Sequence, residues 1–156
     1  MSEIKLKNPQ ELALMRQSGR LLAQVFAYLD LHIKAGLSTM QVNDLTERYI
    51  VDQLASRPAS KGQYGFKYVL NSSVNHVVCH GVPSETQMLK AGDIVNIDIT
   101  LEKNGFIADS SKMYLIGEVT PAARTLVDKT YEAMWEGIKV VKPGATLGDI
   151  GFAIQR

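Results

Sequence analysis

The sequence has a single cysteine, no marked excess of either charge and no long apolar run. Cys79 alone cannot form an internal disulfide, and one free cysteine is typical of a reducing compartment. The net charge of +1 gives no electrostatic reason to expect nucleic acid or an anionic membrane as a partner. The apolar runs are too short to cross a bilayer, and we expect neither a membrane segment nor a signal peptide. These absences favour a cytoplasmic globular protein.

What the sequence does have is enough apolar residues for a core and clear helix signals near its start. Its 156 residues, 46% of them apolar, allow one domain with a proper core. The segment Asn8-Pro9-Gln10-Glu11 combines an N-cap, a first-turn proline and a capping-box glutamate, and helical spacing continues to about Leu31. Ser38 predicts the start of a second helix. The buried face of that helix should carry four apolar residues: Val42, Leu45, Tyr49 and Leu54.

Short runs rich in valine, isoleucine and tyrosine predict β-structure between Tyr68 and Ile116, after a loop-rich stretch from residue 57 to 65. Within it, the valines around His76 predict a strand that ends in a turn at Gly81. Two histidines four residues apart bind zinc well on a helix, so a zinc site is not expected on this strand. His80 should lie at the sheet edge, either hydrogen-bonded to a substrate or exposed without a role.

The helical signals return at Thr120-Pro121 and repeat the opening of the chain. The segments IKAGLSTMQVNDL and VKPGATLGDIGFAI share a lysine, a glycine and a hydroxyl residue, each pair 108 positions apart. Such a repeat indicates a duplicated unit, and the alternative is coincidence between two similar helix starts. The matched pairs are Lys34 with Lys142, Gly36 with Gly144, and Ser38 with Thr146.

If the unit is duplicated, the second copy stops at Arg156 inside its second helix, before any strands. We therefore expect a single truncated domain over residues 1–156. Its missing sheet should leave the apolar face of the first sheet partly uncovered. The alternative is that the first copy covers that face with its own helices.

Two carboxylates flank a hairpin turn. The pair Asn104-Gly105 favours a two-residue turn, which places Thr100 opposite Asp109. Residues two apart on one strand share a face, so Asp98 joins this pair, with the acids roughly 7 Å apart at Cα. A turn one residue longer would send Asp109 to the other face, so this expectation depends on the register.

This face has two interpretations that the residues leave open. It can be the solvent side of an amphipathic strand, with Val95, Ile97, Ile99 and Leu101 turned to the core. It can also be a metal site, because two like carboxylates in a partly dry cup repel unless a cation lies between them. Carboxylate ligands suit divalent Mn, Co, Fe or Zn, and two acids alone make a weak site.

The motifs NHVVCHGVP, GDIVNIDIT and KNGFIADSSKM closely resemble the type I methionine aminopeptidases, and the likeness begins at NPQELALMRQSGRL. The resemblance implies the pita-bread (creatinase/aminopeptidase-like) fold, an α/β (α+β) architecture with pseudo-two-fold duplication. This chain would hold the first half and the opening helices of the second half. The family removes the initiator methionine from nascent proteins, so nascent chains would be its partners and association with the ribosome a further expectation.

The resemblance also implies roles for individual residues. Asp98 would hold one divalent ion and Asp109 would bridge two. Thr100 would orient a ligand carboxylate, and His80 would contact the substrate near the scissile amide. Phe66 would take an aromatic position of the methionine pocket.

The chain departs from the family pattern in two respects. Gln63 and Lys67 replace a frequent aromatic residue and a proline beside the pocket. The family's remaining ligands, one histidine and two glutamates, would lie beyond Arg156. Two rival functions follow: a half-domain without catalytic activity that at most binds, and a non-peptidase of the same fold, against which the type I motifs argue.

Overall fold

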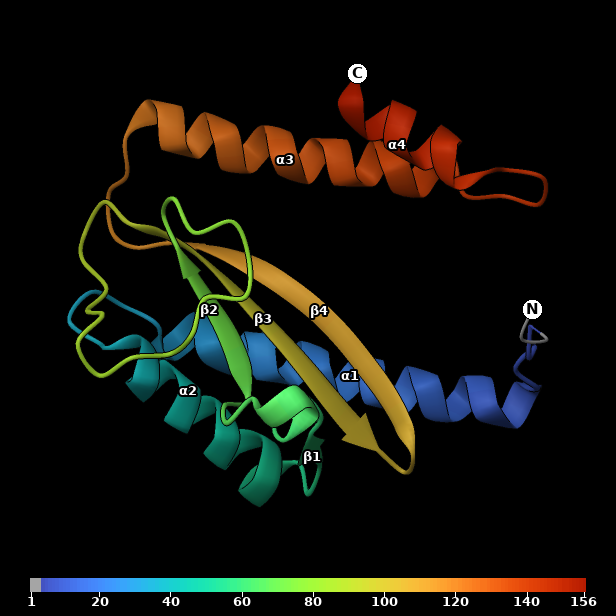
Figure 1. The fold of residues 1–156 in the computed structure, drawn as a ribbon, viewed down its shortest axis with the longest axis horizontal. Coiled ribbons are helices and arrows are strands. Elements are labelled where there is room, and N and C mark those ends of the chain that lie inside the picture. Colours follow the sequence, from blue (N-terminus) through green and yellow to red (C-terminus); the bar gives the residue numbers. More distant parts are fainter. Residues whose placement is uncertain (1–3) are drawn as a thin grey trace. The chain divides into compact units, whose positions relative to one another are not determined.

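The computed structural model describes residues 4–156, which form two compact units (Figure 1). The first unit extends to Glu118 and combines helices with an antiparallel sheet. The second unit, Val119–Arg156, is a pair of helices. The prediction of one catalytic domain over residues 1–156 stays a prediction.

Helix α1, Pro9–His32, begins and ends where the sequence predicts. The Asn8 side chain accepts a hydrogen bond from the Glu11 N–H at 2.9 Å. The Glu11 carboxylate accepts one from the Asn8 N–H at 2.8 Å, which completes the capping box. One face of α1 is buried in the core through Leu22, Val25 and Leu29.

Helix α2, Thr39–Arg48, continues into a π-helical turn, Tyr49–Gln53. Only Val42 of its four predicted core residues is fully buried; the other three, Leu45, Tyr49 and Leu54, are half-buried. The π turn inserts an extra residue and rotates the chain, so Ile50 reaches the core at 0% exposure. Tyr49 and Leu54 still pack against the core, so the predicted face is confirmed there, and Ile50 is a core residue that the pattern missed.

The sheet is antiparallel and is built around one central strand. Strand β3, Ile94–Lys103, pairs with β1, Arg57–Pro58, with β2, Leu70–Val74, and with β4, Phe106–Leu115. A short 3₁₀ turn, Gln63–Gly65, interrupts the loop between β1 and β2.

Strand β2 stops at Val74, earlier than the expected strand through Val78. Asn75 adopts a positive φ of 53°, and its side chain ends the pairing. The amide accepts from the Ile94 N–H at 3.0 Å and donates to the Asp93 carboxylate at 2.8 Å. The side-chain oxygen thus takes the Ile94 N–H that the Asn75 carbonyl would accept in a regular ladder, while the Asn75 N–H still donates to the Ile94 carbonyl at 2.9 Å. Residues 75–83 then form a loop.

The core lies between the sheet and the two helices of the first unit. Val95, Ile97, Ile99 and Leu101 are all 0% exposed. Helix α1 packs against β3 and β4, and α2 packs against β2. The expectation of a partly uncovered apolar face was wrong, because α1 is 24 residues long and reaches along the whole hairpin.

The β3–β4 turn has the predicted two residues, Asn104 at φ 53° and Gly105 at φ 81°. Lys103 pairs with Phe106 on either side of it. The buried hydroxyl of Ser18 donates to the Phe106 carbonyl at 2.8 Å and ties the turn to α1. The register is therefore fixed at its closed end.

The second unit repeats the local geometry of the first. Helix α3, Pro121–Lys139, follows an N-cap threonine, and α4, Leu147–Gln155, begins with a capping box. Gly144 has φ 90°, against 91° for Gly36, its counterpart in the first copy. These shared conformations support duplication over coincidence.

Exposed apolar residues gather on the second helical pair. Counting from the two proline starts, Leu22, Phe26 and Leu29 of α1 correspond to Met134, Ile138 and Val141. The first three pack in or against the core, whereas the second three are exposed. The second copy thus keeps the apolar pattern of a sheet-covering helix.

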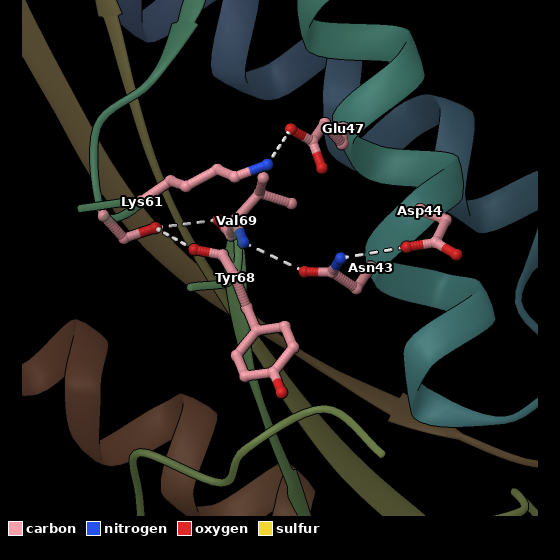
Figure 2. Close-up of polar contacts among 7 residues, drawn as sticks. Asn43, Asp44, Glu47, Lys61, Tyr68 and Val69 are labelled. Carbon is pink, nitrogen blue, oxygen red and sulfur yellow. Dashed lines mark hydrogen bonds and ion pairs between the residues drawn. The ribbon is translucent and has the colours of Figure 1, made fainter. Parts of the chain in front are cut away.

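A buried amide joins α2 to the start of β2 (Figure 2). Asn43, 3% exposed, accepts a hydrogen bond from the Val69 N–H at 2.9 Å and donates to Asp44 at 3.1 Å. The Ser60 hydroxyl donates to the Val69 carbonyl at 3.0 Å, and Lys61 forms an ion pair with Glu47. The Val69 peptide is therefore held from both sides.

We expect Asn43→Ala to lower the free energy of unfolding by about 1–3 kcal/mol, because the buried Val69 N–H loses its acceptor. Asp44→Ala removes only the exposed end of the same network and should change it by less than about 0.5 kcal/mol. Urea denaturation of both variants measures the difference. Equal effects would show that Asn43 does not act through Val69.

Candidate metal centre

An open cavity of about 620 Å³ in the first unit collects the residues singled out in the sequence. Strands β3 and β4 supply its floor, and the loops before and after β2 supply its walls. Every predicted site residue lines it: Phe66, His80, Asp98, Thr100 and Asp109.

The two acids lie on one face of the hairpin, as the turn predicts. Thr100 pairs with Asp109, and Asp98 pairs with Ser111 two residues along. Partial burial raises the pKa of Asp109, and the nearby Asp98 charge and a hydrogen bond with Asp98 raise it further. A hydrogen bond with the Thr100 hydroxyl acts in the opposite direction. The two carboxylates are therefore close enough for the charge of Asp98 to act on Asp109.

Asn71 is a residue of this cavity that the sequence analysis did not single out. It lies opposite Asp98 in the β2–β3 pairing, and its Nδ2 donates to Asp98 Oδ2 at 3.3 Å. Pairing between β2 and β3 spans a long loop, so no turn motif reveals its register. The available signal was weak: a polar residue beside the apolar pair Val69-Leu70.

His80 reaches the cavity from a strained loop. Its φ of 55° lies in the left-handed region, which histidine adopts less readily than glycine. Two hydrogen bonds hold the next residue to β2: Ser72 N–H to the Gly81 carbonyl at 2.7 Å, and Gly81 N–H to the Ser73 hydroxyl at 3.1 Å. A Cβ at Gly81 would overlap the Ser72 carbonyl oxygen, so only glycine allows this close approach.

Phe66 lines the cavity from the loop before β2 and is half-buried. Its ring meets Tyr68 edge-to-face at 5.5 Å. The preceding loop is closed by a hydrogen bond from Gly62 N–H to the Phe66 carbonyl at 2.7 Å. Gln63, one of the departures from the family pattern, donates to the Ala59 carbonyl at 2.8 Å and stabilises the same loop.

The donor set fits a divalent cation in kind but is small in number. Carboxylate oxygens suit hard or borderline ions, and a cation between Asp98 and Asp109 would relieve the repulsion that raises the Asp109 pKa. Across residues 4–156, no three His, Cys, Asp or Glu side chains lie close enough to share an ion. The described residues thus supply two acidic ligands.

The model of metallopeptidase family M24 matches residues 13–156. The chain belongs to metallopeptidase family M24. Among curated relatives, this M24 chain is 43% identical over 152 residues to a methionine aminopeptidase of Rickettsia prowazekii and 39% identical over 153 residues to that of Escherichia coli K12. These alignments cover 97% and 98% of this chain but 58% of each relative.

Solved structures give the same family and the predicted fold. The crystal structure of the methionine aminopeptidase from Rickettsia prowazekii matches with a TM-score of 0.94 at 42% identity, over 98% of this M24 chain and 61% of that chain. An X-Pro aminopeptidase from Thermotoga maritima matches with a TM-score of 0.80 at 18% identity, a likeness of fold alone. The pita-bread fold and the methionine aminopeptidase resemblance are confirmed. No helix within residues 4–156 is long and apolar enough to cross a membrane.

We expect Asp98→Asn to lower the pKa of Asp109 toward its ordinary value in metal-free protein, because the neighbouring charge is gone. The folded-state pKa of Asp109 lies above its unfolded value, so metal-free protein loses stability as the pH rises through that range. The Asp98→Asn variant should lose less stability over the same pH range. Carbon-13 NMR titration of the Asp109 carboxyl measures the shift, with Asp52→Asn, in the exposed π turn, as control. An unchanged pKa in Asp98→Asn would contradict the coupling.

A second prediction concerns the loop that carries His80. Gly81→Ala should destabilise the protein and displace this loop, since the new methyl group meets the Ser72 backbone. Gly19→Ala, with nothing within 4 Å of the added carbon, should instead raise helix stability by about 0.5–1 kcal/mol. Thermal unfolding and the amide spectrum of residues 72–83 compare the two. A Gly81→Ala variant with unchanged thermal stability and an unchanged amide spectrum would mean that the close contact with Ser72 does not hold the loop in place.

Proposed function

We propose that this chain supplies half of the metal centre of a methionine aminopeptidase, which hydrolyses the N-terminal methionine from nascent proteins. The observation that carries the proposal is the meeting of Asp98 and Asp109 with His80 and Phe66 in one cavity. Similarity to methionine aminopeptidases over nearly the whole chain supports the choice of substrate. Nascent chains would place its work in the cytoplasm, next to the ribosome.

Asp98 and Asp109 are the residues that would hold divalent ions, Co, Mn, Fe or Zn. In this proposal Asp98 would hold one ion and Asp109 would contribute to both. Metal bound there would supply Lewis acidity and lower the pKa of a water molecule. Thr100 contributes by a hydrogen bond with Asp109, which favours the ionised form that binds metal.

His80 and Phe66 would act on the substrate. The His80 imidazole, exposed at the cavity wall, can hydrogen-bond the amide to be cleaved. Its pinned loop fixes where that hydrogen bond is offered. Phe66 provides an apolar surface for the methionine side chain, and its contact with Tyr68 limits movement of its ring.

The chain spans 58% of the length of the curated relatives, and the described residues place two acids in the cavity. The small number of acids in the cavity favours a second candidate, a half-domain that binds without turnover. On either reading the complete reaction draws further ligands from outside residues 4–156. Two carboxylates alone hold a metal pair weakly at ordinary free-metal levels.

We expect the 156-residue chain to show little or no hydrolysis of Met-Gly-Ser peptides with Mn²⁺ or Co²⁺. A chimaera in which it replaces the matching part of the Escherichia coli enzyme should hydrolyse them. In that chimaera Asp98→Asn or Asp109→Asn should abolish turnover and metal binding together, because each removes a ligand charge. Peptide hydrolysis and metal content are the measurements.

His80→Ala should lower turnover about 10²–10⁴-fold in the chimaera while the metal content is kept, since its contact is with substrate. Asp52→Asn, on the exposed π turn, is the matched control for charge removal and should behave as the parent. Full turnover in metal-verified Asp98→Asn protein would refute the ligand assignment. Loss of metal in His80→Ala would show that His80 is a metal ligand and not a substrate contact. Robust turnover by the 156-residue chain alone would refute the need for further ligands.

A further inference from the structure

We propose that Asn71 is a positioning residue that holds the Asp98 carboxylate in the orientation in which it meets a metal ion. The inference rests on the function proposed above, in which Asp98 is a ligand. Asn71 faces Asp98 directly across the β2–β3 pair, so both side chains lie on the face that lines the cavity. Its Nδ2 is 3.3 Å from Asp98 Oδ2.

The chemistry of the two groups sets the direction of this contact. An ionised carboxylate only accepts hydrogen bonds, so the NH₂ end of the Asn71 amide must face Asp98. The bond engages one oxygen and restrains rotation of the carboxyl group, while its other lone pairs stay free for an ion. Hydrogen bonds of this kind behind a metal ligand typically change metal affinity 10–100-fold.

The backbone on both sides of Asn71 is held in place. Two residues before it, the Val69 N–H donates to the buried Asn43 side chain of α2 at 2.9 Å (Figure 2). One residue after it, the Ser72 N–H donates to the Gly81 carbonyl at 2.7 Å. The backbone position of Asn71 along β2 is therefore fixed, and so is the position from which its side-chain amide reaches Asp98.

Asn71 also completes a symmetry of donors around the acid pair. Asn71 donates to Asp98 at 3.3 Å, and the Thr100 hydroxyl lies beside Asp109, its partner in the β3–β4 pairing. Each is an uncharged side chain that can donate to a carboxylate oxygen. Neither carries a positive charge that would compete with the metal for the space between the acids.

The test is Mn²⁺ titration of the 156-residue chain, followed by paramagnetic broadening of the backbone amide signals of β3 and β4. This measurement detects weak binding and needs no turnover. We expect Asn71→Leu to weaken Mn²⁺ binding 10–100-fold. Asn71→Ala gives the same loss without bulk, and Asn71→Gln, which keeps an amide donor, should restore part of it.

Asn96→Leu is the matched control. Asn96 lies on the same sheet face, but its amide donates to Ser111 at 3.2 Å and to the Met113 sulfur at 3.4 Å, not to either acid. The Asn96→Leu variant should bind Mn²⁺ as the parent protein does. In metal-free protein, the carboxyl carbon resonance of Asp98 should move in Asn71→Leu and stay in place in Asn96→Leu.

The outcomes separate the two proposals. Parent protein without broadening centred on Asp98 and Asp109 would overturn the metal centre itself, and the positioning role with it. Parent protein that binds while Asn71→Leu and Asn71→Ala bind equally well would overturn only the positioning role. So would an equal loss in Asn96→Leu, or an Asp98 resonance that does not respond to Asn71→Leu.

Discussion

The register of the β3–β4 hairpin is the constraint on which the rest of the site depends. Side chains alternate between faces of a strand, so a slip of one residue would exchange the apolar and the acidic sets. Two features hold the register at its closed end: the positive φ angles of Asn104 and Gly105, and the Ser18 hydroxyl on the Phe106 carbonyl. With the register fixed, one face of the hairpin is covered by helices and the other face carries Asp98 and Asp109.

The acidic face then places two like charges close together, at a cost that the fold tolerates. Partial burial disfavours the ionised form of Asp109 and raises its pKa, and the nearby charge of Asp98 adds to the effect. Nearby neutral donors, Asn71 and Thr100, offset some of this cost. Such an arrangement contributes little to metal-free stability and is understandable as preparation for a cation.

Local rules predicted a large part of this structure. The capping boxes at Asn8 and Ser38 fixed two helix starts, and the Asn104-Gly105 turn fixed which residues share the acidic face. The family motifs also predicted that His80 and Phe66 belong to one site, and both line the same cavity. Their spacing in the sequence alone could not have predicted this.

The errors arose where a side chain competes with the regular backbone pattern. Asn75 ends β2 by bonding to the backbone and side chain of the next strand, and no periodicity reveals that. The π turn after α2 widened the buried face by one residue, so Ile50 enters the core beside Tyr49. Asn71 escaped notice because the β2–β3 register comes from tertiary pairing across a long loop.

The completeness of the first unit has a consequence for how the protein is made. All of its strands, and the helices α1 and α2 that seal its core, are encoded before Val119. A ribosome synthesises from the N-terminus, and domains generally fold as units during synthesis. The sheet and its acid pair can therefore form while α3 and α4 are still being translated. The exposed apolar residues of the second unit would then leave the ribosome after the strands of the first unit have paired, which limits the partners with which they can misassociate.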